Sequence, residues 1–140
     1  MKGYLLVRSE GKSYGLPVAR VLEVGDSTEV LCIPRKVAAV RGLTPLRGRL
    51  VPLIHLGAFL MGREAPASPA DKTVRTVVLV ELGAGGRQVA FEVDDADAVV
   101  REQPLPVPRG QMLPWAAGVA EREDGLVPIL DLDALGDRIA

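Results

Sequence analysis

A stretch of fifteen residues occurs twice in this chain, and the repetition limits what it can fold into. Gly42 to Leu56 reads GLTPLRGRLVPLIHL, and Gly118 to Leu132 reads GVAEREDGLVPILDL. An offset of 76 (118 − 42) aligns the two glycines, the two Leu-Val-Pro triplets and the two final leucines. The centres differ, because residues 45–48 are PLRG whereas residues 121–124 are the more acidic ERED. We therefore predict a shared scaffold in which only the first copy carries a Leu-Arg-Gly turn.

A second match extends the repetition towards the N-terminus. GKSYGL at residues 11–16 corresponds to GRQVAF at residues 86–91, at the similar offset of 75 (86 − 11). We expect two repeats at about 4–61 and 74–139, joined by a linker at 62–73 that is rich in Pro, Ala and charge. Half-chains of about 70 residues bury too little apolar surface to be stable alone. The two repeats should therefore share one core in a single domain covering residues 1–140.

Short β-prone runs separated by glycine turns dominate the pattern of both repeats. The predicted strands are 4–8, 12–18, 18–24, 37–43 and 50–54, followed by 74–82, 87–93, 94–102, 115–122 and 126–130. Short helical turns are expected at Leu56–Met61 and near the C-terminus. Pro52 and Pro128 lack an N–H, so their strands should lie at a sheet edge or carry a bulge there. Many short strands with little helical periodicity predict an all-β fold made of two small barrels.

Composition and charge narrow the possible partners and location. The net charge is −1 and the pI is about 5.8, which argues against nucleic acid as a partner. Tyr4 to Val7 is too short for a signal-peptide core, and no run of about 18 apolar residues predicts a membrane span. We therefore expect a cytoplasmic location and no direct membrane insertion. The single cysteine, Cys32, cannot form an internal disulfide, and we predict a small buried hydrophobic residue there.

Few residues are candidates for catalysis or metal binding. His55 is the only histidine, and no Ser or Cys stands near it in the motif, which favours a structural residue at the end of a strand. Asp94, Asp95 and Asp97 could offer oxygen ligands to a cation, but their spacing favours a solvated turn. Trp115 is expected to be a packing residue, with a binding hot spot as the alternative. We predict no catalytic residues, no metal and no cofactor; the rival hypothesis is a small-barrel enzyme or metal-binding domain around His55 and the aspartates.

Four segments in order resemble the CheW-like chemotaxis coupling proteins. SYGLPVARVLEV is similar to the opening pattern of that family, and VRGLTPLRGRLVPLIHL to its central GV-x-N-x-RG segment. AFEVDDADAV is similar to the second-half segment, and GVAEREDGLVPILDL to the closing motif. The resemblance covers nearly the whole chain.

The resemblance implies a fold and a function. The fold would be two intertwined five-stranded, SH3-like barrels. The function would be that of a non-enzymatic adaptor joining the cytoplasmic tip of a chemoreceptor to the regulatory domain of a CheA-type histidine kinase. The protein would then be recruited to receptor arrays at the inner membrane. An alternative within the same fold is a coupling protein for pilus-based motility or another non-flagellar array.

The partner-contact positions implied by the resemblance are Val21, Glu23, Gly42, Arg47 and Gly48. Arg47 would pair with Glu23, an exposed ion pair that contributes only about 0 to 1 kcal/mol to stability. Arg47 would then act in recognition of a carboxylate or carbonyl on a partner. Gly42 would let a partner's backbone approach closely, so Gly42→Arg is expected to weaken binding and leave the fold intact.

Two residues depart from the family pattern. Pro45 stands where the family has Asn, which removes an amide side chain and a backbone N–H. His55 stands where the family has Asp, whereas Asp131 keeps the Asp in the second copy. Asp is a good helix N-cap and neutral His is expected to be a poor one, so we expect the first repeat to present an altered partner surface.

Overall fold

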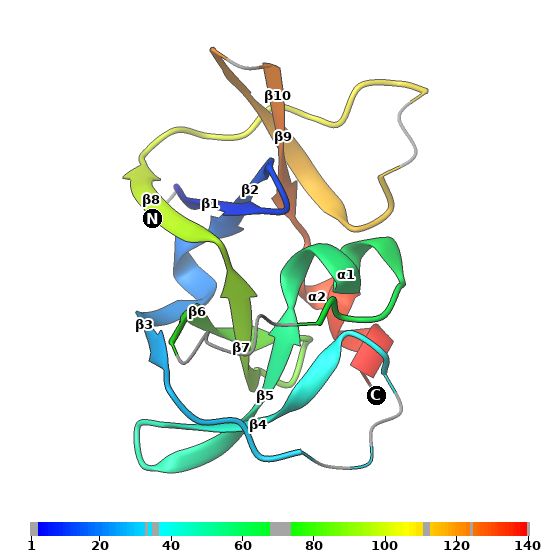
Figure 1. Cartoon of the computed structure of the whole chain (residues 1–140). Helices are drawn as coiled ribbons and strands as arrows, with labels where there is room; N and C mark the ends of the chain where they lie inside the picture. Colours follow the sequence, from blue (N-terminus) through cyan, green and yellow to red (C-terminus); the bar gives the residue numbers. More distant parts are fainter. Residues whose placement is uncertain are drawn as a thin grey trace.

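The strands form two sheets, each of which combines the two ends of the chain (Figure 1). The computed structural model describes residues 3–32, 34, 37–67, 74–110, 113–123 and 125–139. The upper sheet in Figure 1 has the order β8-β1-β2-β10-β9, and the lower sheet has the order β3-β6-β7-β5-β4. The upper strands are β1 (Tyr4–Ser9), β2 (Lys12–Pro17), β8 (Asp95–Val100), β9 (Ala116–Arg122) and β10 (Gly125–Leu130). The lower strands are β3 (Val21–Ser27), β4 (Val40–Leu46), β5 (Arg49–His55), β6 (Arg75–Leu82) and β7 (Arg87–Val93).

The two sheets have the same internal arrangement. Each strand of the upper sheet has an equivalent in the lower sheet whose strand number differs by five: β8, β1, β2, β10 and β9 correspond in order to β3, β6, β7, β5 and β4. Each sheet contains one parallel pair, β2 with β10 and β5 with β7. In the lower sheet the β4–β5 pairing shifts in register between Val40 and Gly42. In the upper sheet the β9–β10 pairing shifts between Ala116 and Gly118, which are the equivalent residues at the offset of 76. The predicted all-β fold with two intertwined five-stranded units is confirmed.

Neither sheet closes into a barrel through a continuous ladder. In the lower sheet a single bridge joins Leu31, just after β3, to Leu43 in β4. In the upper sheet an equivalent bridge joins Leu105, beyond β8, to Val119 in β9. Each bridge carries two backbone hydrogen bonds, with N–O distances of 2.7 and 2.9 Å in the lower sheet and 2.8 Å for both in the upper sheet.

Alternating side chains along the strands supply three apolar clusters. One cluster lies inside the lower sheet and includes Val51, Leu53 and Leu79, and a second lies inside the upper sheet and includes Tyr4 and Ile129. The largest lies between the sheets and is formed mainly by members of β1, β2, β5, β6, β7 and the two helices. Because neighbours on a strand point to opposite faces, Leu53 faces the lower cluster and Ile54 faces the shared core.

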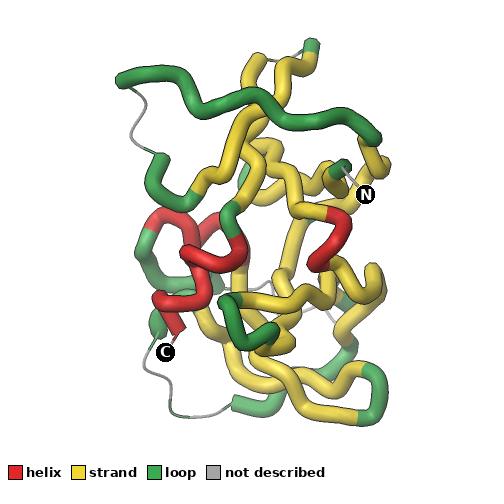
Figure 2. The backbone as a smooth tube through the Cα atoms, turned by 180° about the vertical axis from the view of Figure 1, so that it is seen from behind, coloured by secondary structure: helices red, strands yellow, loops and turns green. Residues whose placement is uncertain are grey.

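Short helices lie against the sheets, as the back view shows (Figure 2). They are α1 (Leu56–Met61), α2 (Leu132–Gly136) and the 3₁₀ turns η1 (Val18–Arg20) and η2 (Asp137–Ile139). The helical turn predicted at Leu56–Met61 is present, as is one near the C-terminus. Among the described residues no helix is long and apolar enough to cross a membrane.

Several local predictions differ from the structure. The run 18–24 begins as a 3₁₀ turn after Pro17, and the strand starts only at Val21. The strand that holds Pro52 is not at an edge, because β5 lies between β7 and β4, but the predicted alternative, a bulge, occurs next to it: the β4–β5 register shifts between Val40 and Gly42, opposite Ile54 and Leu53. Pairing with β7 begins only at Leu53, so the missing N–H of Pro52 falls just outside that ladder. Cys32 is exposed, because it lies beyond β3 and outside the core. Residues 68–73 of the expected linker lie outside the described residues.

Candidate partner-binding site

Arg47 and Gly48 form the tip of the hairpin between β4 and β5. Leu46 and Arg49 are the last paired residues, so the loop has only two residues. Both have a positive φ, 52° for Arg47 and 76° for Gly48, which is the type I′ turn preferred between twisted antiparallel strands. Glycine adopts this conformation freely, but an arginine pays about 1 to 2 kcal/mol for it. A bulky residue held in this conformation at an exposed tip indicates a use for its side chain.

Glu23 on β3 lies opposite this hairpin tip and pairs with Arg47. The Arg47 Nε and Glu23 Oε1 atoms are 3.4 Å apart, so the ion pair implied by the resemblance is present. The Arg47 side chain is 55% exposed and the Glu23 side chain 37% exposed. Solvent screens such a pair, so its contribution to stability is small. The pair places the guanidinium beside the Glu23 carboxylate on the surface.

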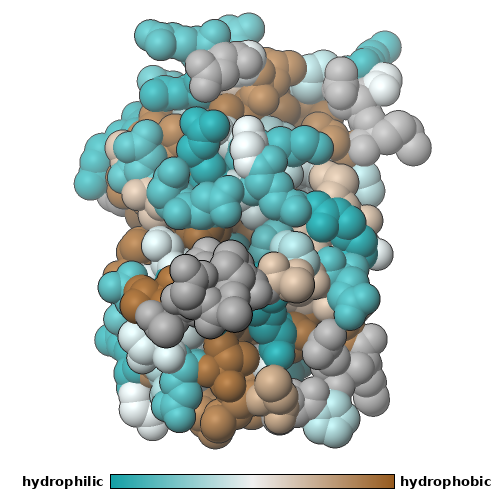
Figure 3. All heavy atoms as spheres, viewed as in Figure 1, coloured by the Kyte–Doolittle hydropathy of each residue, from teal (hydrophilic) through white to brown (hydrophobic). Residues whose placement is uncertain are grey.

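Exposed apolar side chains lie on the strands that carry the ion pair, and those on β3 point to the face opposite Glu23. Leu22 and Val24 flank Glu23 on β3, and Leu50 follows the hairpin tip on β5. Leu50 is 52% exposed, which is high for a leucine in a strand. Hydrophilic residues cover much of the face in Figure 3, and hydrophobic residues reach the surface in separate areas. Sequence reasoning did not single out these three residues, although Leu22 and Val24 alternate with Glu23 in the way that exposes one face of a strand.

Gly42 is buried beneath the bridge between Leu31 and Leu43. A Cβ atom at Gly42 would lie 2.3 Å from the Leu31 carbonyl oxygen, and the φ of Gly42 is 154°. The close backbone approach that the glycine permits therefore comes from this same chain. The expectation that Gly42→Arg leaves the fold intact is wrong, because any side chain collides with the backbone there. Val21 is also partly buried and packs against the shared core.

His55 caps α1, contrary to the prediction that it would do so poorly. Its Nδ1 accepts a hydrogen bond from the Ala58 N–H at 3.1 Å, and Asp131 accepts equivalently from Ala134 N–H at 3.0 Å at the start of α2. An accepting Nδ1 requires a neutral ring with its proton on Nε2. His55 is only 5% exposed, and burial is the main cause that lowers its pKa below 6.5. The cap uses Nδ1, and the buried ring is a structural residue at the end of a strand, as the sequence favours.

The charges around His55 act in both directions on its ionisation. Glu92 and Glu10 favour the protonated ring and so oppose the effect of burial on the pKa, whereas Arg41 and Arg63 add to it. Glu92 is 6% exposed, and its carboxylate binds Arg41 Nε at 2.5 Å. The balance leaves the neutral ring that the helix cap requires.

Asp94 serves the fold. Asp94 accepts a hydrogen bond from the Glu10 N–H at 2.8 Å, which fixes the β1–β2 turn to the start of β8. Among the described residues no group of three or more His, Cys, Asp or Glu side chains lies close enough to hold a metal ion. The packing interpretation of Trp115 fits its 8% exposure and its edge-to-face contact with Tyr14.

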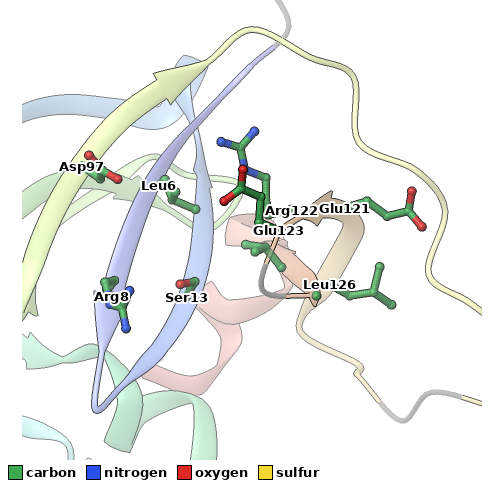
Figure 4. A pocket seen from close by; sticks show the side chains of 10 residues that line it. Leu6, Arg8, Ser13, Asp97, Glu121, Arg122, Glu123 and Leu126 are labelled. Carbon is green, nitrogen blue, oxygen red and sulfur yellow. The ribbon is translucent and has the colours of Figure 1, made fainter.

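The outer end of the upper sheet differs from that of the lower sheet. A cavity of about 780 Å³ opens there, and its lining includes Leu6, Arg8, Asp97, Arg122 and Glu123 (Figure 4). At the offset of 76, Arg122 takes the place of Leu46, which is 9% exposed and packs inside the lower sheet. The two ends therefore differ in chemistry, since an apolar side chain fills one and charged side chains line the other.

The chain is similar to known proteins both in sequence and in fold. Residues 3–140 match the model of the CheW-like domain family. No protein with a curated description matches the chain. Among solved structures, the scaffolding protein TtCheW from Thermoanaerobacter tengcongensis is similar, with a TM-score of 0.76 and 23% sequence identity. The match covers 96% of this chain and 91% of that protein, so the two share a fold over nearly their full lengths.

Proposed function

Because the chain belongs to the CheW-like domain family over residues 3–140, we propose that it is a chemosensory adaptor that couples chemoreceptors to a CheA-type histidine kinase. The family is one of scaffold proteins, and the chain is not an enzyme. An adaptor acts through binding energy alone, by holding kinase and receptor in a fixed geometry. The protein works in the cytoplasm, where receptor arrays at the inner membrane recruit it.

The observation that supports this proposal most directly is the hairpin tip at Arg47. Arg47 has a positive φ, pairs with Glu23 and has a 55% exposed side chain, and the exposed Leu50 follows it on β5, so the hairpin tip combines a hydrogen-bond donor with apolar area. Arginine and exposed apolar groups are typical of the residues that dominate binding energy at protein interfaces. The second repeat has no arginine-glycine turn at this place, so the scaffold does not require one.

We assign the two partners to different parts of the molecule. The hairpin tip and β3, with Val21, Glu23, Arg47 and Gly48, dock on the regulatory domain of the kinase. The boundary between the two sheets receives the helical tip of the receptor. Gly42 contributes indirectly, because it lets Leu31 pack beside Leu43 and so positions β4 under the hairpin tip.

Arg47→Asn is the variant that tests this proposal. Asn tolerates a positive φ better than most residues, so the turn should persist while the guanidinium is lost. We expect the affinity for the kinase regulatory domain to fall about 10- to 100-fold, the range of a lost interface hot spot. Isothermal titration calorimetry with the purified kinase domain and the receptor fragment from the same organism measures both affinities.

Arg109→Asn is the matched control, because Arg109 is exposed and lies outside the hairpin and β3. It should leave both affinities unchanged. If wild-type protein binds neither the kinase domain nor the receptor fragment, the coupling function is refuted. If Arg47→Asn binds the kinase domain as tightly as wild type while remaining folded, the hairpin tip is not the docking surface.

A further inference from the structure

A cavity on a different part of the molecule lies between β2 and β10, beside the end of α1. In the part of the chain that the structure describes, the parallel register of these strands pairs Gly15 with Ile129. The gap between them has a volume of about 390 Å³, and its apolar lining includes Tyr14, Met61, Leu113 and Trp115. Met61 is 47% exposed, so an unbranched, adaptable side chain borders the opening. Pockets of this size accept one or two large side chains of a ligand.

The aromatic residues in this cavity are not a requirement of the repeated scaffold. Tyr14 and Trp115 contact each other with ring centroids 6.0 Å apart at an angle of 63°. At the offsets of 75 and 76, the equivalent residues of the other repeat are Val89 and Ala39. The same strand arrangement is therefore built there without aromatic side chains, and the Tyr-Trp pair is a feature of this cavity alone.

The charge at the cavity is one-sided. Among the described residues, Arg8 and Lys12 are the charged side chains that line it; Arg8 also borders the neighbouring cavity at the outer end of the sheet, whose lining includes Asp97, Glu121 and Glu123. The nearby carboxylate of Glu10 is engaged by Arg63. A pair of cations above an aromatic floor, in a chain whose net charge is −1, complements an anionic ligand that carries apolar groups.

We propose that this cavity is a docking site for an acidic peptide segment of a partner protein, which inserts a large apolar side chain beside Trp115 and places carboxylates against Arg8 and Lys12. The concave shape and the aromatic floor favour a peptide. Two cations are too few to hold a nucleic acid, whose affinity depends on many phosphate contacts. A lipid surface is flat and does not fill a pocket between two strands. The site is separate from the hairpin tip at Arg47, so the variant Arg47→Asn distinguishes it from the proposed kinase-docking surface.

Trp115 is the only tryptophan in the chain, so its fluorescence reports directly on this cavity. The probe is a capped acidic dodecapeptide that contains Leu-Phe pairs and lacks Trp. Two comparison peptides serve as controls. One keeps the apolar residues and has lysine in place of the acidic residues; the other keeps the acidic residues and has serine in place of Leu and Phe. We expect saturable binding of the acidic apolar peptide, with a Kd below about 1 mM and a blue shift of the Trp115 emission.

Charge-reversal variants locate the binding. Lys12→Glu and Arg8→Glu should each weaken binding of the acidic apolar peptide about tenfold or more, whereas the control Arg109→Glu should change it less than about twofold. Lys12 is an exposed residue at the start of β2, so Lys12→Glu should keep the fold. If Arg8→Glu unfolds the protein, Arg8→Ser takes its place. Arg47→Asn should leave peptide binding unchanged, which separates this site from the proposed coupling function.

Several results would overturn the proposal. They are no binding of the acidic apolar peptide at about 1 mM, equal binding of the lysine peptide, or binding that survives reversal of both cations. Anionic phosphatidylglycerol vesicles and a thymidine oligonucleotide serve as competing ligands. If either binds through Arg8 and Lys12 and the peptide does not, the site belongs to that class of partner.

Discussion

Gly42→Ala is the substitution whose effect follows most directly from the geometry. The added Cβ would lie 2.3 Å from the Leu31 carbonyl oxygen and 3.0 Å from its carbonyl carbon. Both atoms are backbone, so they cannot rotate away as the end of a flexible side chain can. The backbone φ of 154° is also one that residues other than glycine rarely adopt.

The expected cost can be estimated from the bonds that must give way. The Leu31–Leu43 bridge carries two hydrogen bonds, of 2.7 and 2.9 Å. Each contributes about 1 kcal/mol net, and the backbone strain costs about 1 to 3 kcal/mol. We therefore expect Gly42→Ala to lower the free energy of unfolding by about 3 to 5 kcal/mol, and the Tm by roughly 10 to 20 °C.

Urea unfolding followed by circular dichroism measures this loss, with Gly48→Ala as the matched control. Gly48 also has a positive φ, 76°, but no atom lies within 4 Å of an added Cβ. Its substitution should cost only about 1 to 2 kcal/mol of backbone strain. Equal destabilisation by the two variants would show that the bridge is not what Gly42 protects. A binding defect in a fully stable Gly42→Ala protein would instead support direct contact with a partner.

Three further predictions concern the caps and the buried ion pair. The free energy of unfolding should be constant above about pH 7.5 and fall as the pH drops through 6.5 towards the lowered pKa of folded His55, because the unfolded chain binds the proton first. His55→Gln should lose this dependence in urea titrations between pH 5 and 8. Asp131→Ala should cost about 1 kcal/mol at pH 7 in the same assay, and a loss below 0.3 kcal/mol would contradict its role as the cap of α2. Glu92→Ala should destabilise by about 3 to 5 kcal/mol, because it removes the carboxylate that pairs with both Arg41 and Arg75, each 13% exposed. Arg41→Ala in the same background should then cost little more if the three charges act as a unit.

The repetition in the sequence was enough to predict the two-part, all-β fold. The periodicity of β-branched runs and the glycine turns located most strands to within a few residues. The intertwining came from the family resemblance, because strand order depends on contacts between residues far apart in the chain. No local pattern indicates that β1 pairs with β8, or that Pro52 lies at the end of a ladder inside the sheet.

The candidate site was only partly accessible from the sequence. The turn at Arg47 and Gly48 and the pair with Glu23 agree with what the residues and the resemblance indicated. The partner-contact role of these residues stays a prediction. Propensity scales treat His55 as a poor cap because they average over exposed positions, whereas burial here keeps the ring neutral and able to accept. The internal collision at Gly42 depends on Leu31, whose position no sequence rule supplies.

The interleaved strand order also governs when this protein can fold during its synthesis. β1 and β2 leave the ribosome first, but their sheet also needs β8, β9 and β10, so it is complete only after residue 130 has been made. The lower sheet needs β7 and is complete after residue 93. Until then the nascent chain exposes apolar strands with unpaired edges, which are prone to aggregate. The lower sheet should therefore form first, and the N-terminal hairpin should depend on chaperone protection until the last strand emerges.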